Sequence, residues 1–158
     1  MVVVSDTSPL RALQAVGLLH VLEPLYTRVL IPTAVARELV VPTQAVSALD
    51  IGSIPFLVVR SPERRLDLPM LGEGETEAIS LAVEVSAYSI IVDDRRARQV
   101  AARMGLRTVG AAAILVAAKH RGLIDHVAPV LEELERKIQF RLSSDVRRTI
   151  LLIAGELD

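Results

Sequence analysis

The sequence predicts an α/β protein in which helices cover both faces of a parallel sheet. Short apolar runs alternate along the chain with segments of helical periodicity, which is the pattern of such sheets. The chain has 158 residues, of which 51% are apolar, and this suits a folded domain with a sizeable core. We find no internal repeat, low-complexity tract or break in composition. We therefore expect a single domain over residues 1–158, with helices at about 123–155 packed on it or on a second subunit.

Five short apolar runs are expected to form the strands. The first consists of valines and ends at Ser5 and Asp6, and the fourth is a buried run that ends at Asp93 and Asp94. The expected strands are residues 2–4, 28–31, 56–59, 89–92 and 107–109.

Capping signals and apolar periodicity mark the helices. Ser8 before Pro9 reads as an N-cap followed by proline at the first helical position. Pro32 is expected to begin a later helix, and Gly105 is expected to end the helix at residues 95–104. The expected helices are residues 9–17, 18–22, 32–39, 42–49, 74–85, 95–104, 111–120, 123–136 and 144–154. Residues 61–70, with two prolines and mixed charge, are expected to form a surface loop.

Three carboxylates occupy positions where an acid is costly unless a positive charge faces it. Asp6 and Asp93 each follow an apolar strand, at the edge where parallel sheets bind ligands. Glu38 shares a helix face with Ala34 and Val35 rather than with solvent. Buried acids need a positive partner. Several of them along one α/β chain suggest a shared divalent cation.

A fourth acid is expected from the helix that begins near residue 74. Glu73, Glu75 and Glu77 all lie where the helix dipole favours a negative charge, which by itself explains them. Glu75 shares a face with small apolar residues that should pack on the sheet, whereas the face of Glu77 is more mixed. Those apolar residues are Ala78, Ile79 and Ala82. We choose Glu75 and keep Glu77 in reserve.

Several neighbouring polar residues have both a structural and a functional interpretation. Asp94 is expected to cap the helix that begins at Arg95. Ser8 can cap its helix or donate to a phosphate. Arg95 and the arginines after it can contact substrate phosphates or form a solvated helix face. Asp6 could instead cap the turn that follows it.

Composition excludes several other classes of protein. Without cysteine there is no disulfide framework, thiolate zinc site or cysteine nucleophile. The longest apolar runs are too short to span a bilayer, and no basic segment precedes a long apolar one. We expect a soluble, cytoplasmic protein without a membrane partner. The chain also has no P-loop and no nucleophile elbow.

Taken in order, four motifs resemble those of PIN-domain proteins, and the resemblance covers nearly the whole chain. They are VVSDTS at residues 3–8, IPTAVARE at 31–38, GETEAISLA at 74–82 and IIVDDRRAR at 90–98. The ordered set is specific, although each motif alone is weak. The chain is similar to VapC-type toxins within a group of prokaryotic PIN proteins.

The resemblance implies a three-layer α/β/α sandwich and a cluster of acids that binds Mg²⁺ or Mn²⁺. Carried over by position, Asp6, Glu38, Glu75 and Asp93 become the catalytic and metal-binding residues of an endoribonuclease. The third acid is commonly aspartate in toxin-like relatives, whereas here it is Glu75, longer by one methylene.

The expected function is RNA cleavage as the toxin of a toxin–antitoxin pair, with an antitoxin protein as a further partner. The alternative is a PIN-like module that binds RNA or a protein with weak or no cleavage. A metal-dependent phosphatase or a DNA flap nuclease is a third hypothesis, but a chain of 158 residues is short for the clamp of a flap nuclease. Apolar helices at residues 123–134 and 150–153 predict a homodimer.

Overall fold

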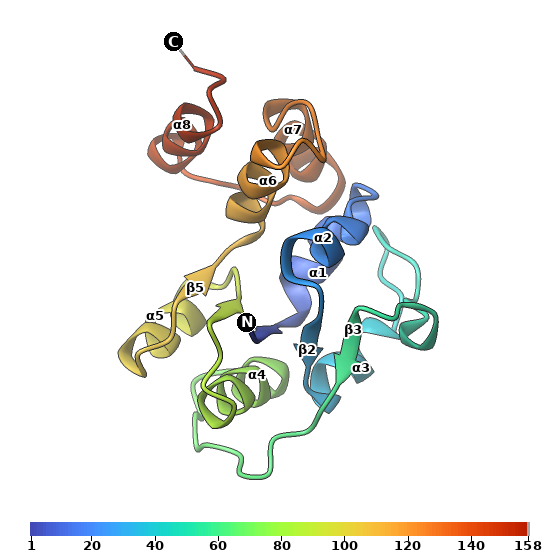
Figure 1. Cartoon of the computed structure of the whole chain (residues 1–158), viewed down its shortest axis with the longest axis vertical. Coiled ribbons are helices and arrows are strands. Elements are labelled where there is room, and N and C mark those ends of the chain that lie inside the picture. The colour runs from blue at the N-terminus through green and yellow to red at the C-terminus, as the bar shows by residue number, and fades with distance from the viewer. Residues whose placement is uncertain (158) are drawn as a thin grey trace.

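In the computed structural model, which describes residues 1–157, five parallel strands form one central sheet (Figure 1). They are β1 (Val3–Ser5), β2 (Val29–Ile31), β3 (Leu57–Val59), β4 (Ser89–Ile91) and β5 (Thr108–Val109). The order across the sheet is β3-β2-β1-β4-β5, so β1 lies in the middle. Val4 stands opposite Leu30 on one side and Ile90 on the other. All five expected strands are confirmed.

Helices connect the strands and extend beyond the last one. The α-helices are α1 (Thr7–Ala15), α2 (Leu22–Tyr26), α3 (Thr33–Leu39), α4 (Glu73–Glu84), α5 (Arg95–Arg103), α6 (Ala111–His120), α7 (Ala128–Ile138) and α8 (Ser144–Ile153). Two short 3-10 helices are η1 (Leu19–Val21) and η2 (Ile51–Ser53).

The alternation of side chains along each strand divides the apolar residues between two cores. Val3 and Ile31 pack with α1, α6 and α7 on one face of the sheet. Val4 and Ile90 pack with α4 and α5 on the other. The predicted three-layer α/β/α sandwich with a central parallel sheet is confirmed. No helix within residues 1–157 is long and apolar enough to cross a membrane. The single domain over residues 1–158 stays a prediction, and residue 158 lies outside the described residues.

The prediction of a helix at residues 42–49 is wrong, because this segment is an irregular loop. The Thr43 hydroxyl accepts hydrogen bonds from the N–H groups of Ala45 (3.3 Å) and Val46 (3.1 Å). Such local bonds compete with the helical pattern. Gln14 of α1 also donates to the carbonyl of Ser47 at 3.0 Å and ties the loop to the helix.

The first helix begins earlier than the sequence predicts. Asp6 occupies the N-cap position and α1 starts at Thr7, so the assignment of Ser8 as N-cap is wrong. The cause is the pairing of the central strand, because the N–H of Asp6 still donates to the carbonyl of Ile91 at 2.9 Å. The chain therefore leaves the sheet at Asp6 and turns directly into the helix. The Asp6 side chain makes no capping hydrogen bond.

The carboxylate of Glu156 joins the C-terminal helices. The helix expected from residue 123 begins at Ala128, because Glu156 accepts hydrogen bonds from the N–H groups of Val127 (2.6 Å) and Ala128 (2.9 Å). Lys119 of α6 pairs with the same carboxylate at 3.0 Å, and the Glu156 side chain is only 10% exposed. Burial raises the pKa of Glu156, but the two N–H groups and Lys119 outweigh it and lower the pKa to about 2.

Replacing Glu156 by glutamine is expected to lower the free energy of unfolding at neutral pH by about 1–3 kcal/mol, since hydrogen bonds to a charged group are lost. A lowered pKa gives stability that is present above the ordinary value of 4.5 and is lost as the pH falls toward 2. The difference between the two proteins should therefore shrink over that range in urea-unfolding curves. Glu133→Gln is the control, because it removes only a surface pair with Lys137 and should change the free energy of unfolding much less. Equal effects of the two substitutions contradict the capping role.

Candidate functional site

The candidate site lies where the strand order reverses. β1 is flanked by β2, which follows it in the chain, and by β4, which comes much later. Ligands of parallel sheets bind at such a switch point, outside the carboxyl ends of the strands. Asp6 directly follows β1 and Asp93 comes two residues after β4. Ser5 pairs with Ile91 in the sheet, which brings the two strand ends side by side.

Asp6 is the most deeply buried of the candidate acids, with 3% of its surface exposed. Burial raises the pKa of its carboxyl to about 7; the N–H of Thr7 lowers the pKa, while the charges of Glu75, Glu38 and Asp93 raise it further. The four predicted acids are therefore close enough to interact electrostatically, although they come from four separate segments of the chain.

Glu38 reaches the site from α3 and is held by residues of α1 and α4. The Thr7 hydroxyl donates to its carboxylate. Arg11 donates from Nη2 to the Glu38 carbonyl at 2.6 Å. The carboxylate also rests against Gly74, where a Cβ atom would lie 2.7 Å from Oε1. A glycine at position 74 thus lets Glu38 approach α4 closely.

The structure separates Glu75 from Glu77. Glu75 accepts the N–H of Gly72 through Oε1 at 3.1 Å, at the start of α4. Burial raises the pKa of Glu75; the Gly72 N–H lowers it, and the charges of Asp94 and Glu38 raise it. Glu77 instead accepts the N–H of Ala34 at 3.1 Å and so serves the first turn of α3. This arrangement favours Glu75 as the third acid and gives Glu77 a structural role.

Asp93 is fixed by the first residues of α6. Its Oδ1 accepts the N–H of Ala111 at 2.9 Å, and a Cβ atom on Gly110 would lie 2.8 Å from the same oxygen. Its Oδ2 is buried and has no hydrogen-bond partner among the described residues. Burial raises the pKa of Asp93, whereas the Ala111 N–H and the charge of Arg98 lower it. Its neighbour Asp94 accepts the N–H of Ala97 at 3.0 Å, so the predicted cap of α5 is confirmed.

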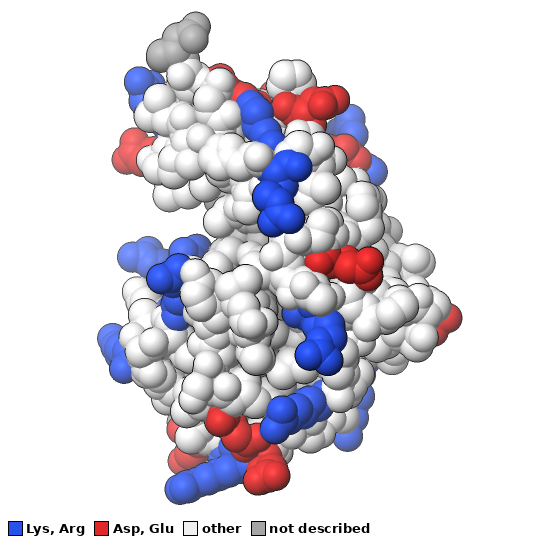
Figure 2. Space-filling view, viewed as in Figure 1, with Lys and Arg blue, Asp and Glu red and all other residues white. Residues whose placement is uncertain are grey.

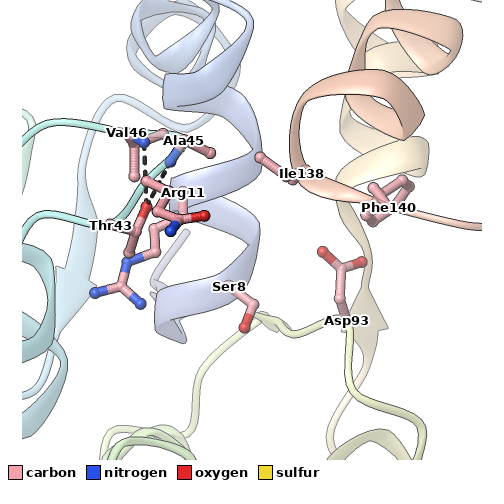
Figure 3. Close-up of a pocket in the computed structure, with 9 residues that line it drawn as sticks. Ser8, Arg11, Thr43, Ala45, Val46, Asp93, Ile138 and Phe140 are labelled. Carbon is pink, nitrogen blue, oxygen red and sulfur yellow. Dashed lines mark hydrogen bonds between the residues drawn. The ribbon is translucent and has the colours of Figure 1, made fainter.

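Two adjoining cavities open beside these acids. The acidic pocket, of about 200 Å³, is lined by Asp6, Glu38 and neighbouring residues. The side pocket, of about 500 Å³, is lined by Asp93, the segment 43–46, Ile138 and Phe140 (Figure 3). Ser8 and Arg11 line both pockets. The two cavities therefore share a boundary formed by one face of α1.

A third cavity adjoins the acidic pocket at Glu75. This arginine pocket, of about 530 Å³, is lined by Glu75, Asp94, Arg95 and Arg96 among others. Glu75 also lines the acidic pocket. Negative charge at the centre is thus followed by positive charge at the start of α5. Figure 2 shows Lys and Arg side chains gathered along the edge of the molecule that α5 forms.

The donor set suits a hard divalent cation, because carboxylate oxygens are the ligands that Mg²⁺ prefers in proteins. Within residues 1–157, no Lys, Arg or His nitrogen lies within 4.0 Å of the carboxylates of the four predicted acids. As placed, no three acidic or histidine side chains in this part of the chain are gathered tightly enough to hold an ion. Local donors hold Glu38, Glu75 and Asp93, so these side chains must rotate to converge. The buried, unpartnered Oδ2 of Asp93 fits such a ligand role.

A family model described as "DUF3368: PIN domain" matches residues 2–156. The chain belongs to this PIN-domain family. Its fold is similar to that of a PilT N-terminus domain protein from the hyperthermophilic archaeon Sulfolobus solfataricus P2, with a TM-score of 0.52 and 18% identity over 90% of this chain and 98% of that chain. At this identity the likeness shows the fold alone. Among curated proteins none matches the chain.

Membership of the PIN family gives the site a chemical context. PIN domains are generally nucleases, typically use divalent metal ions and generally bind RNA. The fold of this PIN domain is therefore of the nuclease type. The carboxylates described above lie at the carboxyl edge of its sheet.

Sequence reasoning missed three residues that shape this part of the PIN domain. Arg11 stands four residues after Thr7 on α1, so helical spacing alone could have placed it on the site's face. Gly74 and Gly110 lie against Glu38 and Asp93. No local pattern distinguishes these two from ordinary glycines at helix starts, because their role depends on a side chain from another element.

The raised pKa of Asp6 predicts an unusual dependence of stability on pH. The folded protein holds this proton more tightly than the unfolded chain, so stability should fall as the pH rises from about 4 to about 7. Asp6→Asn is expected to leave stability near pH 4 unchanged. In the presence of a chelator at about pH 8, it should raise the free energy of unfolding by at most roughly 4 kcal/mol.

Urea unfolding of both proteins over this pH series is the measurement. Asp67→Asn, at an exposed position in the loop before α4, is the control and should follow the wild type. If Asp6→Asn also follows the wild type throughout, Asp6 is not destabilised by burial and neighbouring charge.

Proposed function

We propose that this PIN domain is a metal-dependent endoribonuclease in which Asp6, Glu38, Glu75 and Asp93 hold Mg²⁺ or Mn²⁺. The observation that carries the proposal is the meeting of four carboxylates at the switch point of the sheet, with no Lys, Arg or His nitrogen of residues 1–157 within 4.0 Å of them. A bound divalent ion neutralises charge on the scissile phosphate and makes water a better nucleophile.

Local donors position three of these carboxylates before an ion binds. The Thr7 hydroxyl orients Glu38 and the Ala111 N–H orients Asp93. The Gly72 N–H engages only Oε1 of Glu75. Depth of burial limits the access of bulk water to Asp6.

The arginine pocket supports RNA as the substrate. Arg95 and Arg96 line it next to Glu75. A guanidinium group can donate two parallel hydrogen bonds to two oxygens of one phosphate. A strand whose scissile phosphate lies at the acids can therefore place a neighbouring phosphate against α5. PIN domains generally bind RNA, which agrees with this choice of substrate.

RNA cleavage should require Mg²⁺ or Mn²⁺, and Asp6→Asn should reduce its rate at least about 100-fold while the protein stays folded. The measurement is cleavage of mixed RNAs with each metal and with chelator, with folding checked by circular dichroism. Asp145→Asn, an exposed acid on α8, is the matched control and should retain full activity. Full cleavage by folded Asp6→Asn would overturn the assignment of the site.

A second candidate is a module that binds RNA without cutting it. It is favoured by the glutamate at position 75 and by the separation of the carboxylates, which are not gathered as a ready metal cage within the described residues. Calorimetric titration with Mn²⁺ separates the two candidates. Binding that weakens in Glu75→Gln supports the nuclease, whereas no binding by the wild type supports the module.

In its finer form, the proposal makes this nuclease the toxin of a toxin–antitoxin pair, as the similarity of its motifs to VapC-type toxins suggests. The antitoxin would be a small protein encoded beside it, and it should inhibit RNA cleavage when added.

We also propose a homodimer that uses α8. Val146, Leu152 and Ile153 on this helix are 47%, 50% and 55% exposed, and no residue of α8 is fully buried. Light scattering should show a dimer at micromolar concentration, and the double substitution of Leu152 and Ile153 by glutamate should yield a monomer. A monomeric wild type at high micromolar concentration contradicts the dimer.

A further inference from the structure

We propose that the side pocket holds one nucleobase of the RNA, next to the phosphate that is cut at the acids. This inference rests on the proposed ribonuclease function. It adds to that function a place where the enzyme distinguishes one RNA sequence from another.

The first supporting observation is position, because Ser8 and Arg11 line both the side pocket and the acidic pocket. A nucleotide with its phosphate at the acids therefore has an adjoining cavity of about 500 Å³ for its base.

The second observation is the apolar and aromatic wall of the side pocket. Ile138 ends α7, and Gln139 adopts a left-handed conformation with φ of 56°, after which the chain continues to Phe140. Figure 3 shows Ile138 and Phe140 across the pocket from the segment that carries Thr43 and Val46. Unpaired bases of RNA are bound by stacking on aromatic side chains. Phe140 is the only aromatic residue that lines the pocket within the described part of the chain.

The third observation is a polar wall that is already held in place. The turn at Thr43 is closed by its hydrogen bonds to Ala45 and Val46, and Arg11 anchors the loop through the carbonyl of Val41 at 3.4 Å. This loop presents the exposed Gln44 to the pocket. An amide both donates and accepts hydrogen bonds, which matches the edges of a base.

The positive charge of Arg11 at the edge of the side pocket favours a nucleotide over a purely apolar ligand. The Arg11 guanidinium stands on the boundary with the acidic pocket, where the phosphate of a bound nucleotide must pass. Its bonds to the Glu38 and Val41 carbonyls fix its position without neutralising its charge. An aromatic ring, an amide and a fixed cation around one cavity are together what recognition of a base and its phosphate requires. The enzyme should therefore cut unpaired RNA and depend on the base beside the cut.

The test compares RNAs that differ at single nucleotides. The cut made by the wild type on mixed RNAs is mapped first, and an abasic ribose is then placed in turn at each nucleotide around it. One position should respond, with KM raised roughly 5- to 100-fold by loss of the base and kcat changed little. Phe140→Leu, which keeps apolar packing, should raise KM for the intact RNA within this range and leave the abasic RNA unaffected. Gln44→Ala should change the preference among the four bases at that position.

Phe56→Ala and Phe140→Ala form a matched pair of variants. Both phenylalanines are half-buried and pack against the same core, but Phe56 does not line the side pocket. A similar loss of stability with a rise in KM only for Phe140→Ala supports the inference. Cleavage that is indifferent to every abasic position, or to Phe140→Leu, overturns the inference and leaves the nuclease intact.

A binding measurement keeps the inference testable if no RNA is cut. Fluorescence anisotropy with labelled single-stranded RNA measures affinity for Asp6→Asn alone and combined with Phe140→Leu. Weaker binding of intact but not abasic RNA by the double variant supports the base pocket even when the proposed cleavage fails. Equal binding by both proteins overturns it.

Discussion

Negative charge buried at the carboxyl edge of the sheet is the constraint on which the rest of this PIN domain depends. Asp6, Glu75 and Asp93 all have raised pKa values, and burial is the largest cause in each case. The fold holds the carboxylates with N–H and O–H donors in place of cations. These donors orient the oxygens without cancelling their charge, so the attraction for a cation is preserved.

This constraint explains several features around the edge of the sheet. Glycine at positions 74 and 110 allows Glu38 and Asp93 to lie against helix backbone. Glu77 accepts a hydrogen bond from the first turn of α3, whereas Glu75 stays beside the other acids. Two further cavities adjoin the acidic pocket, one at Glu75 and the other at Ser8 and Arg11. The first is lined by arginines that suit a phosphate, and the second has an aromatic wall that suits a base.

Much of the fold was predictable because strands and helices have local periods. All five strands were expected near their observed positions, and α6 was expected at its observed bounds. The loop at residues 42–49 was not, because its apolar residues resemble those of a helix. What prevents a helix there is the Thr43 hydroxyl together with contacts from α1. The contacts join residues about thirty positions apart, which no local pattern records.

The sequence by itself determined the element types, the apolar faces and the placing of Asp6 and Asp93 after strands. These follow from side-chain alternation and helical spacing, which act over a few residues. Only the tertiary structure decided that β1 lies between β2 and β4, and that Glu75 rather than Glu77 faces the other acids. It also brought Arg11 and Phe140 to the same cavity. Those outcomes depend on packing between segments that lie far apart in the sequence, and the pattern within one segment does not record such contacts.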